Sequence, residues 1–323
     1  MSGVFIAQFQ FFPEQASKTA GQVDTLLICL VLVTGTITFG IAAVMIFFLA
    51  KYRKRVAADR TPPKSGSLPV EVTWSVIPFL IFLGFFGWGA KIYFDESAVP
   101  KNAMEVHVIG KQWMWKLEHL QGKREINQLH APLGQTVKLM MTSEDVIHSF
   151  FVPAFRIKED VLPGRYTTQW FEATRVGTYQ IFCAQYCGTN HALMIGQVIV
   201  MTPTDFAAWL KTGRETVSVA QRGERLFHSF GCSGCHAAQA VVRAPLLEGI
   251  YGSQVPLADG RIVHADERYL RDCILIPNTQ VVAGFDPVMP SFQGRISEDD
   301  LFAIITYLKS IGSSPPEASI PNR

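Results

Sequence analysis

The stretch GTYQIFCAQYCGTNHALMIGQVIVM, residues 177–201, places four soft metal donors between two alternating apolar segments. The donors are Cys183, Cys187, His191 and Met194, in the spacing C-x3-C-x3-H-x2-M. The alternation of apolar and polar residues on either side predicts two β-strands. The loop that joins these strands therefore presents two thiols, an imidazole and a thioether at one end of a predicted sandwich.

Several kinds of site use cysteines at close spacing. A disulfide between Cys183 and Cys187 would leave His191 and Met194 unexplained, and zinc rarely recruits methionine. Thiolate, imidazole and thioether together favour copper. Because two thiolates can bridge two coppers, each copper then needs its own terminal imidazole, and His148 in HSFFVP is the upstream candidate. The remaining histidines that compete with it are interpreted as surface or structural, the first in a strand and the others in polar, loop-like contexts: His107, His119, His130, His228 and His264.

The section around this loop, roughly 103–201, is composed of short alternating segments separated by turn signals such as PLGQ and RVGT. This pattern predicts an antiparallel β-sandwich. A short helix and a linker are expected in TPTDFAAWLKTGRETVS, and the section after it is predicted to be helical. Ser297 is a predicted N-cap of the last helix, which has acidic residues in its first turn.

The helical section carries a second chemical motif, CSGCH at residues 232–236. C-x-x-C-H is the pattern of covalent c-type haem attachment, in which Cys232 and Cys235 form thioethers and His236 becomes an iron ligand. Met289 lies in the Pro-rich stretch DPVMPSF, ahead of the last predicted helix. This order predicts a small cytochrome with His236 and Met289 as the axial ligands. Cys29 lies in an apolar stretch and is interpreted as a small apolar residue there, and Cys273 is interpreted as a buried, unreactive thiol.

Two apolar stretches precede the sandwich, with expected spans of about 26–50 and 72–93. They are charge-free over residues 26–50 and 72–90, and each is long enough to cross a bilayer as a helix. The loop between them is basic, with KYRKR at 51–55, so it is expected on the cytoplasmic side, with both termini outside. No cleaved signal peptide is expected ahead of the first stretch. A net charge of +2 gives no argument for nucleic-acid binding.

With these motifs in place, the chain resembles subunit II of haem–copper cytochrome c oxidases, in the caa-type form with a fused C-terminal cytochrome c. The matching stretches cover most of residues 70–310 and include VEVTWSVIP, GKQWMWKLE, DVIHSFFVPAFRIKEDVLPGR, CAQYCGTNHALM, CSGCH and VMPSFQGRIS. The resemblance implies a multidomain membrane protein: a two-helix transmembrane hairpin, a cupredoxin-like β-sandwich and an all-α class I cytochrome c domain. The expected boundaries are 1–24 for an outer N-terminal segment, 25–95 for the hairpin, 103–203 for the copper domain, 204–217 for the linker and 218–323 for the cytochrome domain.

The resemblance also implies residue roles. Cys183 and Cys187 would bridge the two coppers, His148 and His191 would be terminal ligands, and Met194 and the backbone carbonyl of Gln185 would be the weak ligands. Trp113 matches a tryptophan at the electron-entry surface, and Glu71 matches an acidic residue near the mouth of a proton path into subunit I.

Gln185 departs from the family pattern. Many members have glutamate between the two cysteines, and its carboxylate helps to bind magnesium or manganese at the contact with subunit I. An amide is a poorer ligand for a hard cation, so the resemblance gives only weak support for that site in this chain.

The implied function is electron transfer from an external donor, through the c-type haem and the dinuclear copper centre, to subunit I, which reduces oxygen to water and translocates protons. Expected partners are subunit I, subunit III, membrane lipid, and either soluble cytochrome c, another high-potential donor or a quinol-oxidising complex. The expected location is the bacterial cytoplasmic membrane, with the copper and haem domains on its outer side. Two alternatives are the equivalent subunit of a copper-containing nitric oxide reductase and a membrane electron carrier without a catalytic partner. Nitrous oxide reductase shares the copper motif but has a large propeller domain.

Overall fold

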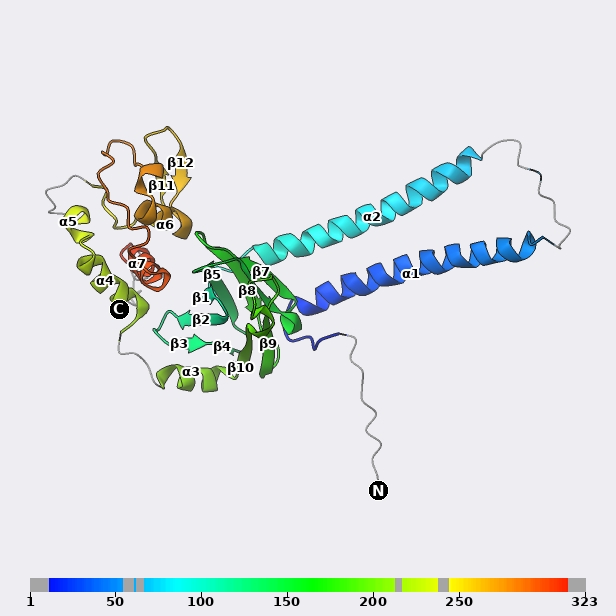
Figure 1. Cartoon of the computed structure of the whole chain (residues 1–323), viewed down its shortest axis with the longest axis horizontal. Helices are drawn as coiled ribbons and strands as arrows, with labels where there is room; N and C mark the ends of the chain where they lie inside the picture. Colours follow the sequence, from blue (N-terminus) through cyan, green and yellow to red (C-terminus); the bar gives the residue numbers. More distant parts are fainter. Residues whose placement is uncertain (1–11, 55–60, 62–66, 213–216, 238–243, 313–323) are drawn as a thin grey trace, which may run out of the picture.

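The protein has three parts that follow one another along the chain, as the computed structural model shows for residues 12–54, 61, 67–212, 217–237 and 244–312 (Figure 1). Two long helices lie side by side and project from a β-sandwich, and a group of shorter helices packs on another side of the sandwich. The expectation of no signal peptide falls mostly on residues 1–11, which lie outside the described residues, as does most of the basic loop at 55–60 and 62–66.

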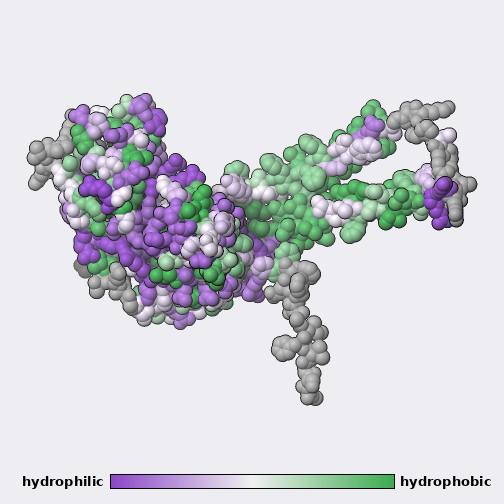
Figure 2. Space-filling view, in the orientation of Figure 1, coloured by the Kyte–Doolittle hydropathy of each residue, from purple (hydrophilic) through white to green (hydrophobic). Residues whose placement is uncertain are grey.

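The long helices are α1 (Ala20–Lys51) and α2 (Leu68–Ser97). Both extend beyond the expected spans of 26–50 and 72–93, because polar residues at each end continue the helix. Both are long and apolar enough to cross a membrane, and their apolar side chains face outward, as for Phe39 at 78% exposure. Figure 2 shows this apolar surface along the hairpin. Within α1 the hydroxyl of Thr34 donates to the carbonyl of Leu30 at 2.8 Å, so a polar group is satisfied without water. The two helices indicate a membrane anchor.

The sandwich consists of two five-stranded sheets, in the orders β3-β2-β1-β5-β8 and β4-β10-β9-β6-β7. The strands are β1 (Met104–Lys111), β2 (Met114–His119), β3 (Arg124–Ile126), β4 (Gln128–Pro132), β5 (Thr136–Ser143), β6 (His148–Val152), β7 (Ile157–Val161), β8 (Thr167–Glu172), β9 (Gly177–Cys183) and β10 (Ile195–Met201), with the 3-10 turns η1 (Pro153–Phe155) and η2 (His191–Leu193). The expectation of a purely antiparallel sandwich was wrong, since β1 pairs with β5 and β10 pairs with β4 in parallel. Neither parallel pair is consecutive in the chain, so no hairpin signal in the sequence could have revealed it.

Side chains from both sheets fill one apolar core, with Val106, Val108, Trp115 and Phe150 at 0–1% exposure. In β1, however, five consecutive residues from Val106 to Gly110 are buried rather than alternate ones. A strand buried on both faces must be covered on its outer side as well. The C-terminal helical region provides that cover.

The C-terminal helical region contains α4 (Val219–Ser229), α5 (Ser233–His236), α6 (Glu267–Leu275), α7 (Glu298–Ser310), the turn η3 (Pro277–Thr279) and a small hairpin of β11 (Gln254–Pro256) and β12 (Ile262–His264). The predicted N-cap is confirmed, because the Ser297 hydroxyl accepts the backbone N–H of Asp300 at 3.2 Å. Helices α4 and α7 cross so closely at Gly223 that a Cβ there would lie 1.9 Å from the carbonyl oxygen of Ala303. Only glycine fits that crossing.

The predicted linker contains helix α3 (Pro203–Lys211), which lies against the sandwich through Trp209, stacked on His130 at 4.3 Å between ring centroids. The interpretation of His119 and His130 as loop residues was wrong. They lie in β2 and β4 and both contact the Glu125 carboxylate. His228 and His264 likewise lie in a helix and a strand, α4 and β12.

Candidate metal centre and haem cleft

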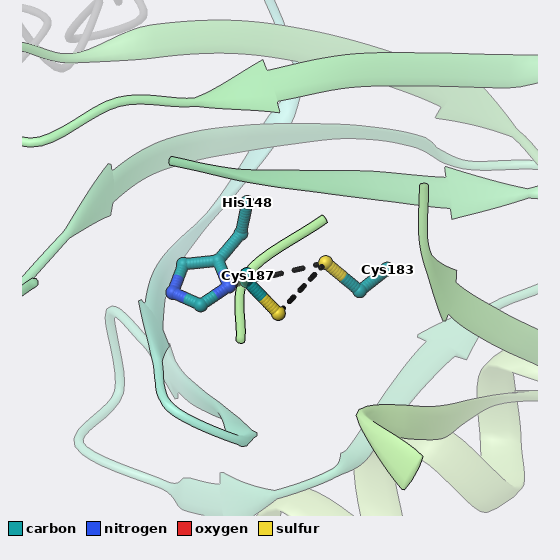
Figure 3. Close-up of side chains that lie close together, drawn as sticks. All are labelled: His148, Cys183 and Cys187. Atoms are coloured by element: carbon teal, nitrogen blue, oxygen red, sulfur yellow. Dashed lines mark hydrogen bonds between the residues drawn. The ribbon is translucent and has the colours of Figure 1, made fainter. Parts of the chain in front are cut away.

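The fold gathers the soft donors at one end of the sandwich. His148 begins β6, Cys183 ends β9, and Cys187 lies in the loop that follows. The ligand atoms of these three residues lie within 4.8 Å of one another, and all three side chains are buried (Figure 3). His148 stands 35 residues before Cys183 in the chain, so the pairing of β6 with β9 brings it to the loop.

The donor atoms form a chain of short separations. The Sγ atoms of Cys183 and Cys187 are 3.7 Å apart, and Cys183 Sγ is 3.9 Å from the Nδ1 of His148. Cys187 Sγ is 3.4 Å from His191 Nδ1 and 3.8 Å from Met194 Sδ. The carbonyl oxygen of Gln185 lies 3.2 Å from Cys183 Sγ. Two sulfurs at the centre, with an imidazole beside each, fit a centre in which two thiolates join two soft metal ions.

Asp145, which the sequence analysis missed, orients one imidazole. Its Oδ1 lies 2.8 Å from His148 Nε2, and since a carboxylate can only accept, Nε2–H donates and Nδ1 is left for a metal. Its Oδ2 accepts the backbone N–H of Gln112 at 2.8 Å. Burial opposes ionisation, but these hydrogen bonds hold the pKa of Asp145 below its usual range. The signal for this role in the sequence was the position of Asp145, an acid three residues before the candidate ligand His148.

The two thiols differ in acidity. Burial acts to raise the pKa of Cys183, but its hydrogen bonds with His148 and with the backbone reverse this, and its pKa lies below the usual range. Burial raises the pKa of Cys187, and the negative charge of Cys183 raises it further. Without a metal, therefore, one thiolate is favoured over two. Cations supply the charge that makes the second ionisation favourable, so metal uptake should release protons.

The candidate electron-entry residue Trp113 lies directly against the metal loop. Its indole N–H donates to the carbonyl of Cys187 at 3.2 Å, and the Gln112 amide donates to the same oxygen at 2.8 Å. Glu71 is not brought to this site. It lies exposed in the first turn of α2, at the end of the hairpin far from the sandwich (Figure 1).

Gly110 is a further residue that sequence reasoning missed. A Cβ built on it would lie 2.8 Å from Cδ2 and 3.3 Å from Cγ of the His148 ring, so the strand and the imidazole are in contact. We expect Gly110→Ala to displace the ring and to lower copper affinity by roughly 10–100-fold, the usual cost of disturbing the support of a ligand. Titration of the purified chain against a copper chelator measures this. Gly84→Ala, where no atom lies within 4 Å of the added Cβ, is the control. Equal affinities in the two variants would contradict the prediction.

The second candidate site is an apolar cleft in the C-terminal helical region. Cys232, Cys235, His236 and Met289 all line it, together with apolar side chains that include Phe227, Leu247, Ile274, Phe292, Ile304 and Leu308. His236 Nδ1 lies 2.9 Å from the carbonyl of Pro245, which can only accept, so Nδ1–H donates and Nε2 is left for iron. Two thiols, an imidazole and a thioether around one apolar cleft fit a covalently held haem.

Comparison with known proteins matches the sandwich and the C-terminal helical region to two known families. The family described as "Cytochrome C oxidase subunit II, periplasmic domain" matches residues 119–202, and the family "Cytochrome c" matches residues 220–312. Cytochrome c oxidase subunit 2 of Thermostichus vulcanus is 30% identical over 295 residues, 73% of this chain and 90% of that protein. Cytochrome c oxidase subunit 2 of Alkalihalophilus pseudofirmus is 28% identical over 300 residues, 88% of this chain and 86% of that protein.

A solved structure, the periplasmic domain of subunit II of cytochrome oxidase of Bradyrhizobium japonicum, is 30% identical and covers 36% of this chain and 96% of its own, with a TM-score of 0.35. Copper and haem c are the cofactors that the two matched families imply. The chain belongs to the cytochrome c oxidase subunit II family, in the form that carries a cytochrome c domain after the copper domain, and it is therefore part of an oxidoreductase complex.

Proposed function

We propose that this chain carries electrons one at a time from an external donor to subunit I, where oxygen is reduced to water and protons are translocated. The observation that carries the proposal is the presence, in one chain, of a buried set of copper donors and an apolar cleft with a complete haem-attachment set. When bound, the haem iron and the copper ions supply the one-electron redox chemistry.

The residues have distinct roles in this proposal. Cys183 and Cys187 would be the shared thiolate ligands of two coppers, His148 and His191 would be the imidazole ligands, and Met194 and the Gln185 carbonyl would be the weak ligands. In the cleft, Cys232 and Cys235 would hold the haem covalently, and His236 and Met289 would be the ligands of its iron. Because Cys183, Cys187 and Met194 are 8%, 3% and 0% exposed, the protein keeps these three donors out of water.

The chain is proposed to lie in the bacterial cytoplasmic membrane, with the sandwich and the C-terminal helical region on the outer side. Trp113, through its hydrogen bond to Cys187, would receive electrons for the copper centre. Glu71, at the opposite end of α2, would lie near the cytoplasmic surface, where a proton path into subunit I would open. Soluble cytochrome c or a quinol-oxidising complex would be the donor, and subunit III a further partner.

Purification of the complex with subunit I tests this function. We expect two coppers and one covalent haem per chain, a mixed-valence spin signal from an electron shared equally by two coppers, and oxygen uptake with a reduced high-potential donor. One copper per chain, or zinc bound after copper is offered, would refute the dinuclear centre. Reduction of nitric oxide without oxygen uptake would refute the oxidase assignment.

Gln185 gives a separate prediction. Only its carbonyl would face a copper, so Gln185→Ala should retain both coppers. Gln185→Glu adds a charged oxygen donor, and it should raise manganese affinity at the contact with subunit I. Manganese taken up during growth and detected by its spin signal measures this. Strong manganese binding in the unmutated complex would show that the amide does not weaken the site.

A further inference from the structure

Helix α7 lines the candidate haem cleft and also packs against the sandwich. Ile304 and Leu308 on this helix line the cleft. Phe302 on the same helix is 0% exposed and packs in a separate cluster with Met140 of β5. One face of α7 therefore belongs to the candidate haem site, and another face covers the outer side of the first sheet.

At the centre of this contact, two rings are stacked. The imidazole of His107 on β1 lies 3.5 Å from the Phe302 ring between centroids, with 8° between their planes. His107 is 1% exposed, so of the two interpretations given for it, surface or structural, the structural one is confirmed. Burial and the nearby positive charge of Lys309 lower the pKa of His107 to about 3, so the stacked ring is neutral at physiological pH. The contact is a packed ring pair and carries no buried charge of its own.

Strand β1 connects this ring pair to the copper donors. His107 and Gly110 are three positions apart in the same strand, and Gly110 touches the His148 ring. The strand is held on both sides, by β2 and by β5. A rigid element therefore runs from the contact with the C-terminal helical region to a proposed copper ligand.

Charged side chains of the sandwich and of the C-terminal helical region pair with one another near the two stacked rings. Lys309 of α7 lies 3.1 Å from Glu105 of β1 and 2.9 Å from Glu267 of α6. Lys138 of β5 lies 3.1 Å from the same Glu105 and 3.4 Å from Glu267. The four side chains are only 11–20% exposed, and their ion pairs form a closed circuit in which acid and lysine alternate. The sandwich and the C-terminal helical region each provide one acid and one lysine. Partly buried charges in such a circuit disfavour any other position of the helical region on the sandwich, because a shift of one against the other would leave a charge unpaired.

From these contacts we propose that His107 and Phe302 are positioning residues that hold the C-terminal helical region in one docked arrangement on the sandwich, with the haem cleft at a fixed separation from the copper loop. This inference rests on the proposed function, because its consequence concerns electron transfer. In that step a haem held in the cleft would give up one electron and copper held by the donor loop would accept it, so that no bond would be made or broken.

The experiment uses the full chain in detergent. His107→Ala and Phe302→Ala remove one ring each, and His107→Phe keeps a stacking ring without the imidazole nitrogens. Ile262→Ala, at a site in β12 that is 70% exposed, is the control for truncation of an apolar side chain. Amide hydrogen exchange in β1 and α7 reports docking whether or not metals are bound. The rate of haem-to-copper electron transfer after photoreduction of the haem reports its consequence, and the absorption spectra report whether each site is intact.

Both alanine variants should increase exchange in β1 and α7 by about a hundredfold, the order expected for truncation of a buried ring, while β9 stays protected. Electron transfer should slow in both alanine variants, because its rate falls as the separation between the two redox centres increases. The haem and copper spectra should not change, and His107→Phe should restore both readouts. Unchanged exchange and rate in the alanine variants, or a His107→Phe variant that behaves like them, would overturn the inference.

Two outcomes keep the tests separate. If Phe302→Ala fails to attach haem, His107→Ala still decides the question, because its ring belongs to the sandwich. If the proposed function is wrong, the unmutated chain will lack the copper signal or the covalent haem, whereas hydrogen exchange will still show whether the ring pair holds the two parts together.

Discussion

Cys187→Ser is expected to abolish the shared-electron signal and to lower copper affinity by at least about a hundredfold, since loss of a supporting contact alone costs about 10–100-fold. Cys187 Sγ lies within 3.8 Å of Cys183 Sγ, His191 Nδ1 and Met194 Sδ, so it is central to the donor set. A hydroxyl is a harder donor than a thiolate and ionises much less readily. Copper content and the spin spectrum of the purified chain measure the effect.

Cys29→Ser is the matched control, because it makes the same chemical change in α1, far from the donor loop. It should retain two coppers per chain and the shared-electron signal. Copper uptake by the unmutated chain should also release protons, since the raised pKa of Cys187 keeps that thiol protonated until a cation binds. If Cys187→Ser retains both coppers with an equally shared electron, Cys187 does not bridge the centre.

Met289→Ala is expected to open the sixth coordination position of the haem and to lower its reduction potential, because methionine ligation raises the potential. We expect a decrease larger than about 59 mV, the step that changes a one-electron equilibrium tenfold. Met289 lines the cleft together with His236, so its thioether can reach a haem held there. Redox titration of the haem absorption bands measures the shift, and carbon monoxide binding to the reduced haem measures the open position.

Met201→Ala is the control for this change, since it removes the same side chain from the last position of β10 in the sandwich. It should leave the potential and the carbon monoxide affinity of the haem as they are. The haem should survive acid–acetone extraction in both variants, because both retain Cys232 and Cys235, the residues proposed to hold it covalently. An unchanged potential in Met289→Ala would mean that another residue is the sixth ligand.

The sequence by itself determined the sites whose residues lie close together in the chain. The spacing of Cys183, Cys187, His191 and Met194 confines all four to one short segment, and the structure brings the other three donor atoms within 3.8 Å of Cys187 Sγ. CSGCH is similarly local, and two long apolar runs are sufficient to predict the two helices that could cross a membrane. The two motifs depend on residues that are close in sequence, and a membrane helix depends on the length of one apolar run. Spacing and composition are therefore sufficient to predict them.

Only the tertiary structure decided the contacts that depend on strand pairing and on docking. The parallel pairing of β1 with β5 could not be inferred from local alternation, nor could the contact of Gly110 with His148. His107 gave no signal in the sequence, because a histidine in a strand has the same local pattern whether its outer face meets water or Phe302. Its burial depends on residues almost two hundred positions later, and contacts at such separation are set by how packed surfaces and charges fit together, which the local pattern of the chain does not encode.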